Sequence, residues 1–167
     1  MKNIYELFDH ALSIVEECCG DVVEPINEVR INYRSKKRWG MCKYTSSTDS
    51  NVIEISNRIL GDDVPYEKVL QVVVHEVLHA TYGCHNHGKL WKRRAAQVME
   101  KYPELNISRC NSASEFGVSE YKCPEKKYAV QCPICKRTWR RAKQSKLITQ
   151  TWRYSCKMCS AKLVRIL

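Results

Sequence analysis

The sequence has no long run of apolar residues. Its first 20 residues are amphipathic and contain acids, so they resemble neither a signal peptide nor a membrane helix. It also has no internal repeat and no low-complexity tract, which argues against repeat architectures. We therefore expect an intracellular, cytoplasmic protein without a membrane partner, nucleoid-associated in a bacterium or nuclear in a eukaryote. Its 167 residues suffice for one core of ordinary size, or for a core domain with a small appendage.

Acidic residues are scarce in the last part of the chain. Residues 122–167 contain 13 Lys and Arg but only one acid, Glu125, whereas residues 1–121 contain 15 bases and 17 acids. The formal net charge of +10 therefore belongs to the C-terminal part. Such a local excess of cations favours a polyanion as the partner of that part.

Cysteine, in contrast, is abundant, with ten residues. Without an export signal, a chain of this length is not expected to be a disulfide scaffold, so the thiols indicate metal ligands or free buried thiols. Two C-x-x-C pairs, CPIC and CKMC, are 20 residues apart, a spacing typical of a structural zinc site. The four predicted ligands are Cys132, Cys135, Cys156 and Cys159. Four thiolates leave no position for a substrate, so this zinc is expected to be structural and the fold a zinc ribbon, with two redox pairs as the alternative.

The other six cysteines have no ligand spacing, and we expect structural thiols, with Cys123 as the one spare ligand. They are Cys18, Cys19, Cys42, Cys84, Cys110 and Cys123.

The periodicity of the chain predicts an α+β fold. The expected elements are a helix from Ile4 to Cys18 capped by Asn3, strands at 28–34 and 51–56, a further strand or turn at 38–44, a helix from Asp62–Pro65 to about Gly83, and a helix from about His87 to Lys101. Residues 103–122 lack sustained periodicity and are expected to be a connector. We thus predict a first domain at 1–122, which includes this connector, and a basic four-cysteine zinc ribbon at 123–167.

One stretch, VVVHEVLHATYGCHNHGKLWK (72–92), holds four of the five histidines. His75 and His79 are four residues apart and project from one face of a helix, at a spacing that lets both bind one Zn²⁺. Glu76 can reach a metal-bound water as a general base without being a ligand. The alternative is a buried helix that happens to contain histidine. Burying these ionisable groups without a metal or a partner would cost several kcal/mol, which favours the zinc site.

A catalytic zinc needs a third protein ligand and an open fourth position. Three residues compete for the third place. His87 precedes Gly88 and would open the second helix, where Trp91 could bury and orient it. His85 lies six residues after His79, the distance in a known zinc-protease pattern, but that pattern wants glycine where Tyr82 stands. Glu100 is the remaining option.

Cations and aromatic residues alternate in the ribbon. Cations neutralise phosphates and aromatic faces stack on unpaired bases, so the mixture predicts binding of single-stranded or distorted nucleic acid. The alternative is that the aromatics form the small core and the charges a solvated face. The predicted contact residues are Arg137, Trp139, Arg140, Arg141, Lys143, Trp152 and Arg153.

The order of these motifs resembles the SprT family of zinc metalloproteins, which includes the Spartan-type protease domain. HEVLH (75–79), HGKLW (87–91), the CPIC…YSCKMC ribbon and the segment INYRSKKRWGMCKY…NVIEIS are similar to the family's motifs in the family's order. The resemblance spans roughly residues 1–165. It implies a minimal zincin-like domain of helices and a small antiparallel sheet, zinc ligands His75, His79 and His87, and a catalytic Glu76.

For function, the resemblance implies a zinc endopeptidase that cleaves proteins bound or crosslinked to DNA, with one catalytic and one structural Zn²⁺. Two other classes remain open. One is a nucleic-acid-binding adaptor with weak or no hydrolase activity, although a scaffold has no need of Glu76 between its ligands. The other is a zinc hydrolase for a small molecule, which the large basic ribbon fits poorly because a small anion needs only a few cations.

Overall fold

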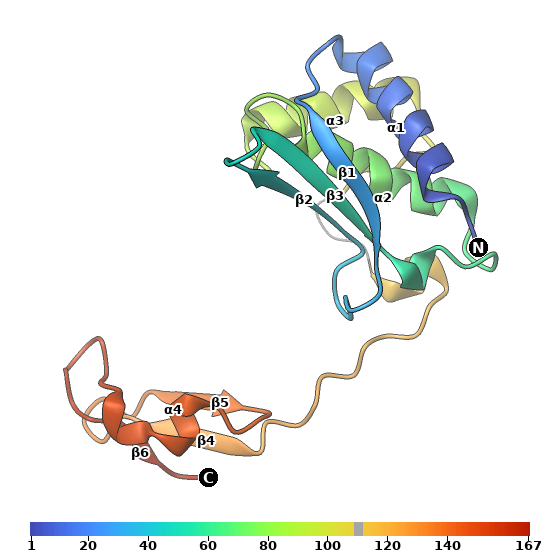
Figure 1. Cartoon of the computed structure of the whole chain (residues 1–167). Helices are drawn as coiled ribbons and strands as arrows, with labels where there is room; N and C mark the ends of the chain where they lie inside the picture. Colours follow the sequence, from blue (N-terminus) through green and yellow to red (C-terminus); the bar gives the residue numbers. More distant parts are fainter. Residues whose placement is uncertain (109–111) are drawn as a thin grey trace. The chain divides into compact units, whose positions relative to one another are not determined.

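The computed structural model describes residues 1–108 and 112–167. The chain folds into two compact units (Figure 1). Unit 1 is Met1–Tyr121 and unit 2 is Lys122–Leu167. Each has its own cluster of buried apolar side chains. Both units combine helix and strand, as the predicted α+β class requires. No helix in the described part of the chain is long and apolar enough to cross a membrane.

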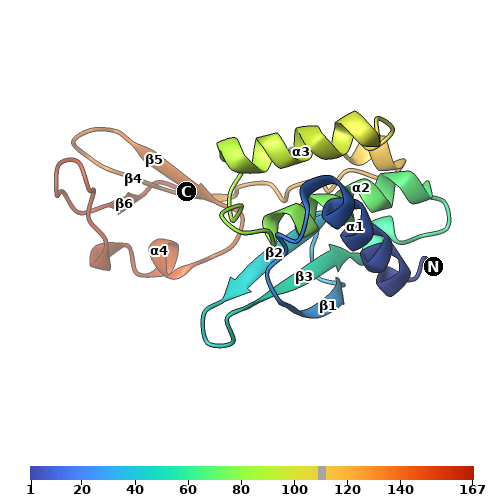
Figure 2. The ribbon, with the colours of Figure 1, turned by 90° about the horizontal axis from the view of Figure 1, so that it is seen from above.

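Unit 1 consists of a three-stranded sheet and three α-helices. Its elements are α1 (Ile4–Cys19), β1 (Ile26–Asn32), β2 (Gly40–Thr45), β3 (Ser50–Ser56), the 3₁₀ turn η1 (Asn57–Ile59), α2 (Tyr66–His79), α3 (Lys89–Lys101) and the 3₁₀ turn η2 (Ala113–Phe116). Figures 1 and 2 show the three helices on the same side of the sheet. The core lies between the helices and the sheet. The apolar stripe of α1 faces α2, and Ile53 and Ile55 of β3 are completely buried.

The sheet is mixed, which corrects the antiparallel sheet expected from the sequence. Its order is β1-β3-β2; β1 runs parallel to β3 and β2 antiparallel to it. Alternating apolar and polar residues predict that a segment is a strand, but not which strand it pairs with. The loop before β2 lets the chain return to the edge of the sheet, so β3 takes the central position.

The helix boundaries also differ from those expected. The helix α2 begins after Pro65, which occupies the N-cap position itself, and ends at His79 rather than near Gly83. It ends there because Thr81 leaves the helix to form a β-bridge with Val23. The helix α3 begins at Lys89, so His87 precedes it rather than opening it. The first helix and its cap by Asn3 are confirmed.

Residues 103–108 and 112–121 contribute to the core of unit 1 and do not only connect the units. Leu105, Ile107 and Phe116 are buried in the core of unit 1, and the Phe116 ring lies 4.9 Å from that of Trp39. Isolated apolar residues between Pro, Asn, Ser and Gly carry no periodicity, so the sequence did not reveal this packing.

A buried carboxylate fixes the central strand to its neighbour β1. Glu54 accepts hydrogen bonds from Arg30 Nε at 3.0 Å and from Asn32 Nδ2 at 2.5 Å. The hydrogen bond from Arg30 holds the pKa of the Glu54 carboxyl below its ordinary value of 4.5. Because the folded-state pKa is lowered, this contribution to stability is fully present above about pH 4.5 and is lost as the pH falls through the folded-state pKa.

We expect Glu54→Gln to lower the free energy of unfolding by about 1–3 kcal/mol at pH 7, because it removes charge-assisted hydrogen bonds to a buried group. The difference from wild type should shrink as the pH falls below about 4. Urea unfolding at several pH values measures it. Glu28→Gln is the matched control, since Glu28 bonds the same Arg30 from an exposed position. An equal loss for Glu54→Gln at pH 7 and pH 3 would show that the carboxylate charge is not responsible.

Unit 2 is a small three-stranded sheet with short helical turns. Its elements are β4 (Tyr128–Gln131), β5 (Thr138–Arg141), α4 (Lys146–Thr149), the 3₁₀ turn η3 (Thr151–Arg153) and β6 (Val164–Arg165), with the strand order β5-β4-β6 and both pairings antiparallel. Its buried apolar residues number six, two of which are cysteines of the C-x-x-C pairs: Ala129, Val130, Cys132, Ile148, Cys156 and Leu163.

Candidate functional site

Three histidines converge at the end of α2. The Nε2 atom of His87 lies 3.0 Å from that of His75 and 3.1 Å from that of His79. The ligand atoms of the three rings all lie within 4.8 Å of one another. His75 and His79 come from one face of α2, as their spacing predicts, and His87 approaches from the segment before α3.

The protonation of these rings fits a bound cation. Burial, followed by the nearby His79 and His87, lowers the pKa of His75 to about 3, and burial lowers the pKa of His79. The Nδ1 atom of His79 lies 2.8 Å from the carbonyl oxygen of Cys84. Because that oxygen can only accept, Nδ1 carries the hydrogen and the Nε2 lone pair is free for a metal. The three Nε2 atoms face one another at 3.0–3.1 Å, close to the spacing of about 3.3 Å expected between tetrahedral zinc ligands.

The ring of Trp91, on α3, packs against all three histidine rings. Its ring centroid lies 4.8 Å from that of His75, 5.4 Å from that of His79 and 4.6 Å from that of His87. Trp91 is only 4 % exposed, so it excludes water from one side of the three rings. The sequence predicted this burial against His87, and the structure extends it to all three histidines.

The two alternatives for the third ligand are not part of the converging group. His85 is outside the histidine group: its Nε2 lies 3.6 Å from Glu24 Oε1 and its ring lies 5.5 Å from that of Tyr44. Glu100 is exposed on α3 and is also outside the group.

Glu76 lies in the pocket that the histidines line. It is 7 % exposed, and burial raises the pKa of its carboxyl to about 8, against the lowering effects of a backbone hydrogen bond from Cys42 and of the nearby Arg38 charge. A bound cation nearby would lower this pKa, because its positive charge stabilises the ionised carboxylate. The pocket has a volume of about 530 Å³. Among the residues that line it are His75, Glu76, His79, His85, His87, Gln71, Trp39, Gly40 and Cys42.

Gly40 allows β2 to pass close to this carboxylate. A Cβ atom at position 40 would lie 2.5 Å from Glu76 Oε1 and 2.6 Å from Glu76 Cγ, well inside van der Waals contact. The sequence alone did not indicate a role for Gly40, because a single glycine in a strand is only a weak sign that another group approaches closely. Gln71 was missed as well: it lines the pocket one turn before His75, and its buried amide has no hydrogen-bond partner among the described residues.

A second candidate metal centre lies in unit 2. Sγ of Cys132 is 3.2 Å from that of Cys159, and Sγ of Cys135 is 3.6 Å from that of Cys156. These separations exclude covalent bonds and are near those between thiolates that share a tetrahedral metal. Backbone hydrogen bonds favour a thiolate: the N–H of Met158, together with that of Cys159, lowers the pKa of Cys156. The residue after each pair, Lys136 or Ser160, has a positive φ.

The remaining cysteines lie outside this group. Cys123 is exposed and is not among the four converging thiols, so it has no place as a ligand here. Cys84 is buried and Cys18, Cys19 and Cys42 are partly buried, all as free thiols. Cys110 lies outside the described residues.

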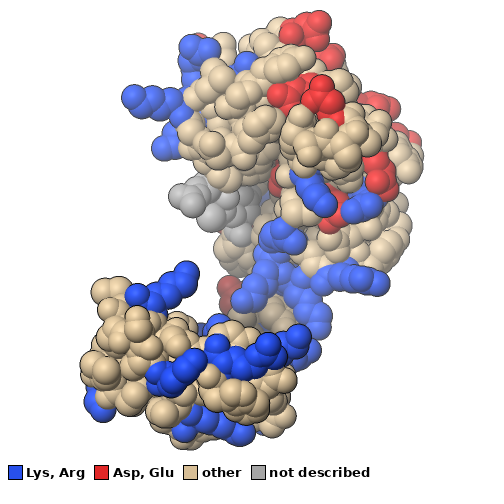
Figure 3. All heavy atoms as spheres, turned by 60° about the vertical axis from the view of Figure 1, so that its left-hand side comes forward, with Lys and Arg blue, Asp and Glu red and all other residues tan. Residues whose placement is uncertain are grey.

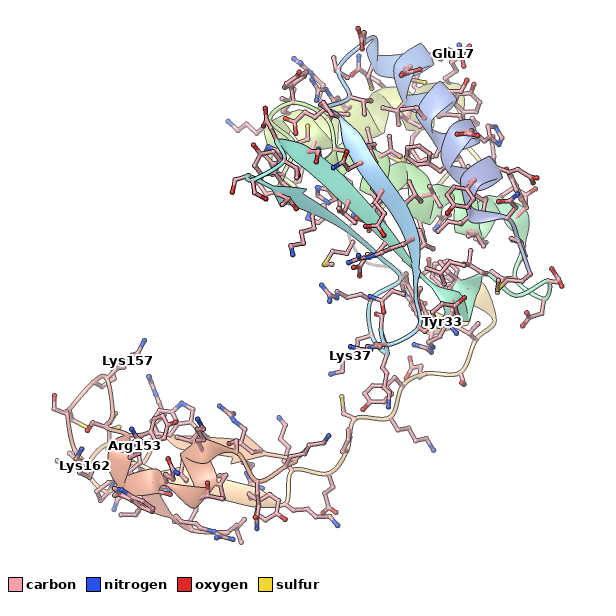
Figure 4. All side chains as sticks on the ribbon, viewed as in Figure 1. Glu17, Tyr33, Lys37, Arg153, Lys157 and Lys162 are labelled. Atoms are coloured by element: carbon pink, nitrogen blue, oxygen red, sulfur yellow. The ribbon has the colours of Figure 1, made fainter. Side chains whose placement is uncertain are left out.

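The predicted nucleic-acid residues of unit 2 fall into two groups. Trp139 is half-buried and packs against the small core. Trp152 is 67 % exposed. The others are exposed cations: Arg137, Arg140, Arg141, Lys143 and Arg153. Figure 3 shows Lys and Arg side chains spread over the visible face of unit 2 with hardly any acids among them, and Figure 4 labels Arg153 near Lys157 and Lys162.

One of two comparisons with known proteins finds a match. The model of the SprT-like family matches residues 4–111, which include the sheet, the three helices and the three converging histidines. No curated protein matches the chain. The match ends before unit 2, so the four-cysteine centre rests on the arrangement of its own thiols.

Proposed function

Because the chain belongs to the SprT-like family, in general a family of metalloproteases, we propose that it is a zinc endopeptidase that cleaves proteins bound or crosslinked to DNA. The observation that carries this proposal is the convergence of three imidazole Nε2 atoms in one pocket with a buried carboxylate. That donor set is typical of catalytic zinc, because three protein ligands leave a fourth position open.

His75, His79 and His87 would hold the catalytic zinc, and the four cysteines the structural one. Zinc bound by the histidines supplies Lewis acidity, which lowers the pKa of water and polarises a scissile carbonyl. Glu76 is placed to take the proton of the attacking water and to pass it to the leaving amine. The hydrogen bond from the Cys42 backbone and the close approach of Gly40 hold its carboxylate in one position.

Unit 2 would supply the attachment to DNA. Its net charge of +12 and its exposed Trp152 suit a single strand, whose phosphates attract cations and whose bases stack on an aromatic face. A protein bound to the same strand would then be cleaved because it is near, rather than because its side chains are recognised.

The test is cleavage of a basic DNA-binding protein by the full-length, zinc-loaded chain, with and without a single-stranded oligonucleotide. We expect DNA-stimulated cleavage that a zinc chelator abolishes. The absence of cleavage in both conditions, with zinc bound and DNA binding intact, would favour the non-catalytic adaptor instead.

Gly40→Ala should lower the cleavage rate at least tenfold, because the new methyl group would displace the Glu76 carboxylate from its position. Zinc content should stay unchanged, since no ligand moves. A kinetic assay with a zinc titration measures both quantities. Lys43→Ala, an exposed position on the same strand, is the control and should keep the wild-type rate. Retention of full activity in Gly40→Ala would remove this contact from the mechanism.

The two tryptophans of unit 2 should behave differently. Trp152→Ala is expected to weaken binding of single-stranded DNA by on the order of tenfold, since one base–aromatic stack is lost, and to leave stability unchanged. Trp139→Ala should mainly lower the thermal stability of unit 2, because Trp139 packs against its core. Fluorescence anisotropy and thermal unfolding of both variants separate these effects. Equal loss of affinity at unchanged stability would place both rings in the interface.

A further inference from the structure

We propose that the loop at residues 33–38 of unit 1, here named the basic loop, is a second contact surface for single-stranded nucleic acid, beside the pocket that holds Glu76. This inference rests on the proposed function for its biological sense, because it would place the DNA strand next to the site of cleavage.

The charge of the basic loop contrasts with that of the unit around it. Four of its six residues are Arg34, Lys36, Lys37 and Arg38, and none is acidic, whereas residues 1–121 as a whole have a net charge of −2. All four cations are exposed. Arg34, Lys36 and Arg38 form no ion pair with any acid in the described part of the chain. Four cations with no acid among them attract a polyanion.

Hydrogen bonds hold the loop in a defined shape. Asn32 Oδ1 accepts from the N–H groups of Arg34 and Ser35, both at 2.9 Å. Ser35 Oγ donates to the carbonyl of Arg38 at 2.7 Å. Arg58 donates from Nη1 to the carbonyl of Lys36 at 2.6 Å. The backbone that carries the cations is thus ordered before a ligand arrives, and a pre-ordered surface loses less entropy on binding.

An exposed aromatic residue favours single-stranded nucleic acid over an acidic peptide as the partner of the loop. Tyr33 begins the basic loop and is 68 % exposed, and Figure 4 shows it on the same loop as Lys37. Lys36 Nζ lies 5.4 Å from the ring centroid of a second tyrosine, Tyr121. An acidic peptide would need only the cations. A single strand uses both, because phosphates bind the cations while an unpaired base stacks on an exposed ring.

The basic loop continues into the wall of the active-site pocket. Lys37 and Arg38 line that pocket together with His75 and Glu76. A strand held by the loop would therefore pass the entrance of the pocket. A protein attached to that strand would be presented to the catalytic carboxylate from within unit 1, in addition to the attachment that unit 2 supplies.

The test compares two double charge reversals in the full-length, zinc-loaded protein. Arg34→Glu with Lys36→Glu alters the basic loop. Lys92→Glu with Arg93→Glu, two exposed cations on α3, is the matched control with the same change of net charge. The measurement is the affinity for a single-stranded oligonucleotide at several salt concentrations. We expect the loop variant to bind at least tenfold more weakly at low salt and to lose about 1.4 from the slope of log K against log salt, the amount for two phosphate contacts. The control should change both quantities much less.

A neutral variant tests the aromatic contact separately. Tyr33→Ala should weaken binding by on the order of tenfold at an unchanged salt slope, while Tyr33→Phe, which keeps the ring, should bind as wild type. The proposal is overturned if the loop and control reversals have the same effect on the slope. It is equally overturned if the loop reversal abolishes binding of a polyglutamate peptide and spares the oligonucleotide. Because binding is the readout, absence of proteolysis would count against the proposed function and not against this surface.

Discussion

Glu76→Gln should reduce kcat/KM for DNA-stimulated cleavage by roughly 10²–10⁴-fold, the contribution of a positioned general base. The glutamine side chain has nearly the same shape and can still accept the backbone hydrogen bond from Cys42, but it cannot take up a proton at neutral pH. Zinc content should not change, because Glu76 is not among the three converging ligands.

Without zinc, the stability of this variant should equal or exceed that of metal-free wild type. In the metal-free protein, burial raises the pKa of Glu76 to about 8, which means that this folded state disfavours the ionised carboxylate. A neutral amide avoids this unfavourable burial. An inactive but stable Glu76→Gln variant would therefore separate a catalytic role from a structural one.

The measurement is the initial rate on a basic DNA-binding protein, together with zinc content and thermal unfolding. Glu100→Gln is the control, since Glu100 is an exposed carboxylate on α3 outside the pocket. A Glu76→Gln variant that cleaves within a few-fold of the wild-type rate would contradict the proposed mechanism.

The sequence predicted the part of the site that a regular helix defines. His75 and His79 share a face because they are one turn apart, and Glu76 follows directly from the first of them. It could not decide between His85 and His87, because the chain between His79 and Lys89 is irregular and includes Gly83 at φ +73°. In such a segment, spacing along the chain does not fix the direction in which a side chain points.

Contacts between segments that are far apart in the chain could not be predicted from the sequence either. Gly40 approaches Glu76 from a strand 36 residues earlier, and nothing local to either residue records that approach. The parallel pairing of β1 with β3 could not be predicted for the same reason, because the residues of one strand do not determine which strand it pairs with. Trp139 and Trp152 both lie among cations in the sequence, so the sequence does not distinguish them. In the structure, Trp139 pairs with Val130 across two strands and therefore packs against the core.

The second large effect is expected for Cys156→Ser, which removes one of the four converging thiols of unit 2. Only four buried apolar residues of this unit are not cysteines, far fewer than a stable fold of its size requires. Binding of a structural zinc contributes on the order of 10 kcal/mol to the folding of such small units. We therefore expect unit 2 of this variant to unfold, and the zinc content to fall from two ions per chain to one.

Unit 1 has its own core and should keep both its unfolding transition and its zinc. Affinity for single-stranded DNA should fall at least tenfold, but a steep salt dependence should remain, because the cations of unit 2 are still on the chain. Amide exchange, zinc analysis and anisotropy titrations measure these quantities. Cys123→Ser, an exposed thiol outside the centre, is the control and should match wild type in all of them. If Cys156→Ser binds DNA as tightly as wild type, the folded ribbon is not needed, and its charge alone accounts for the attachment.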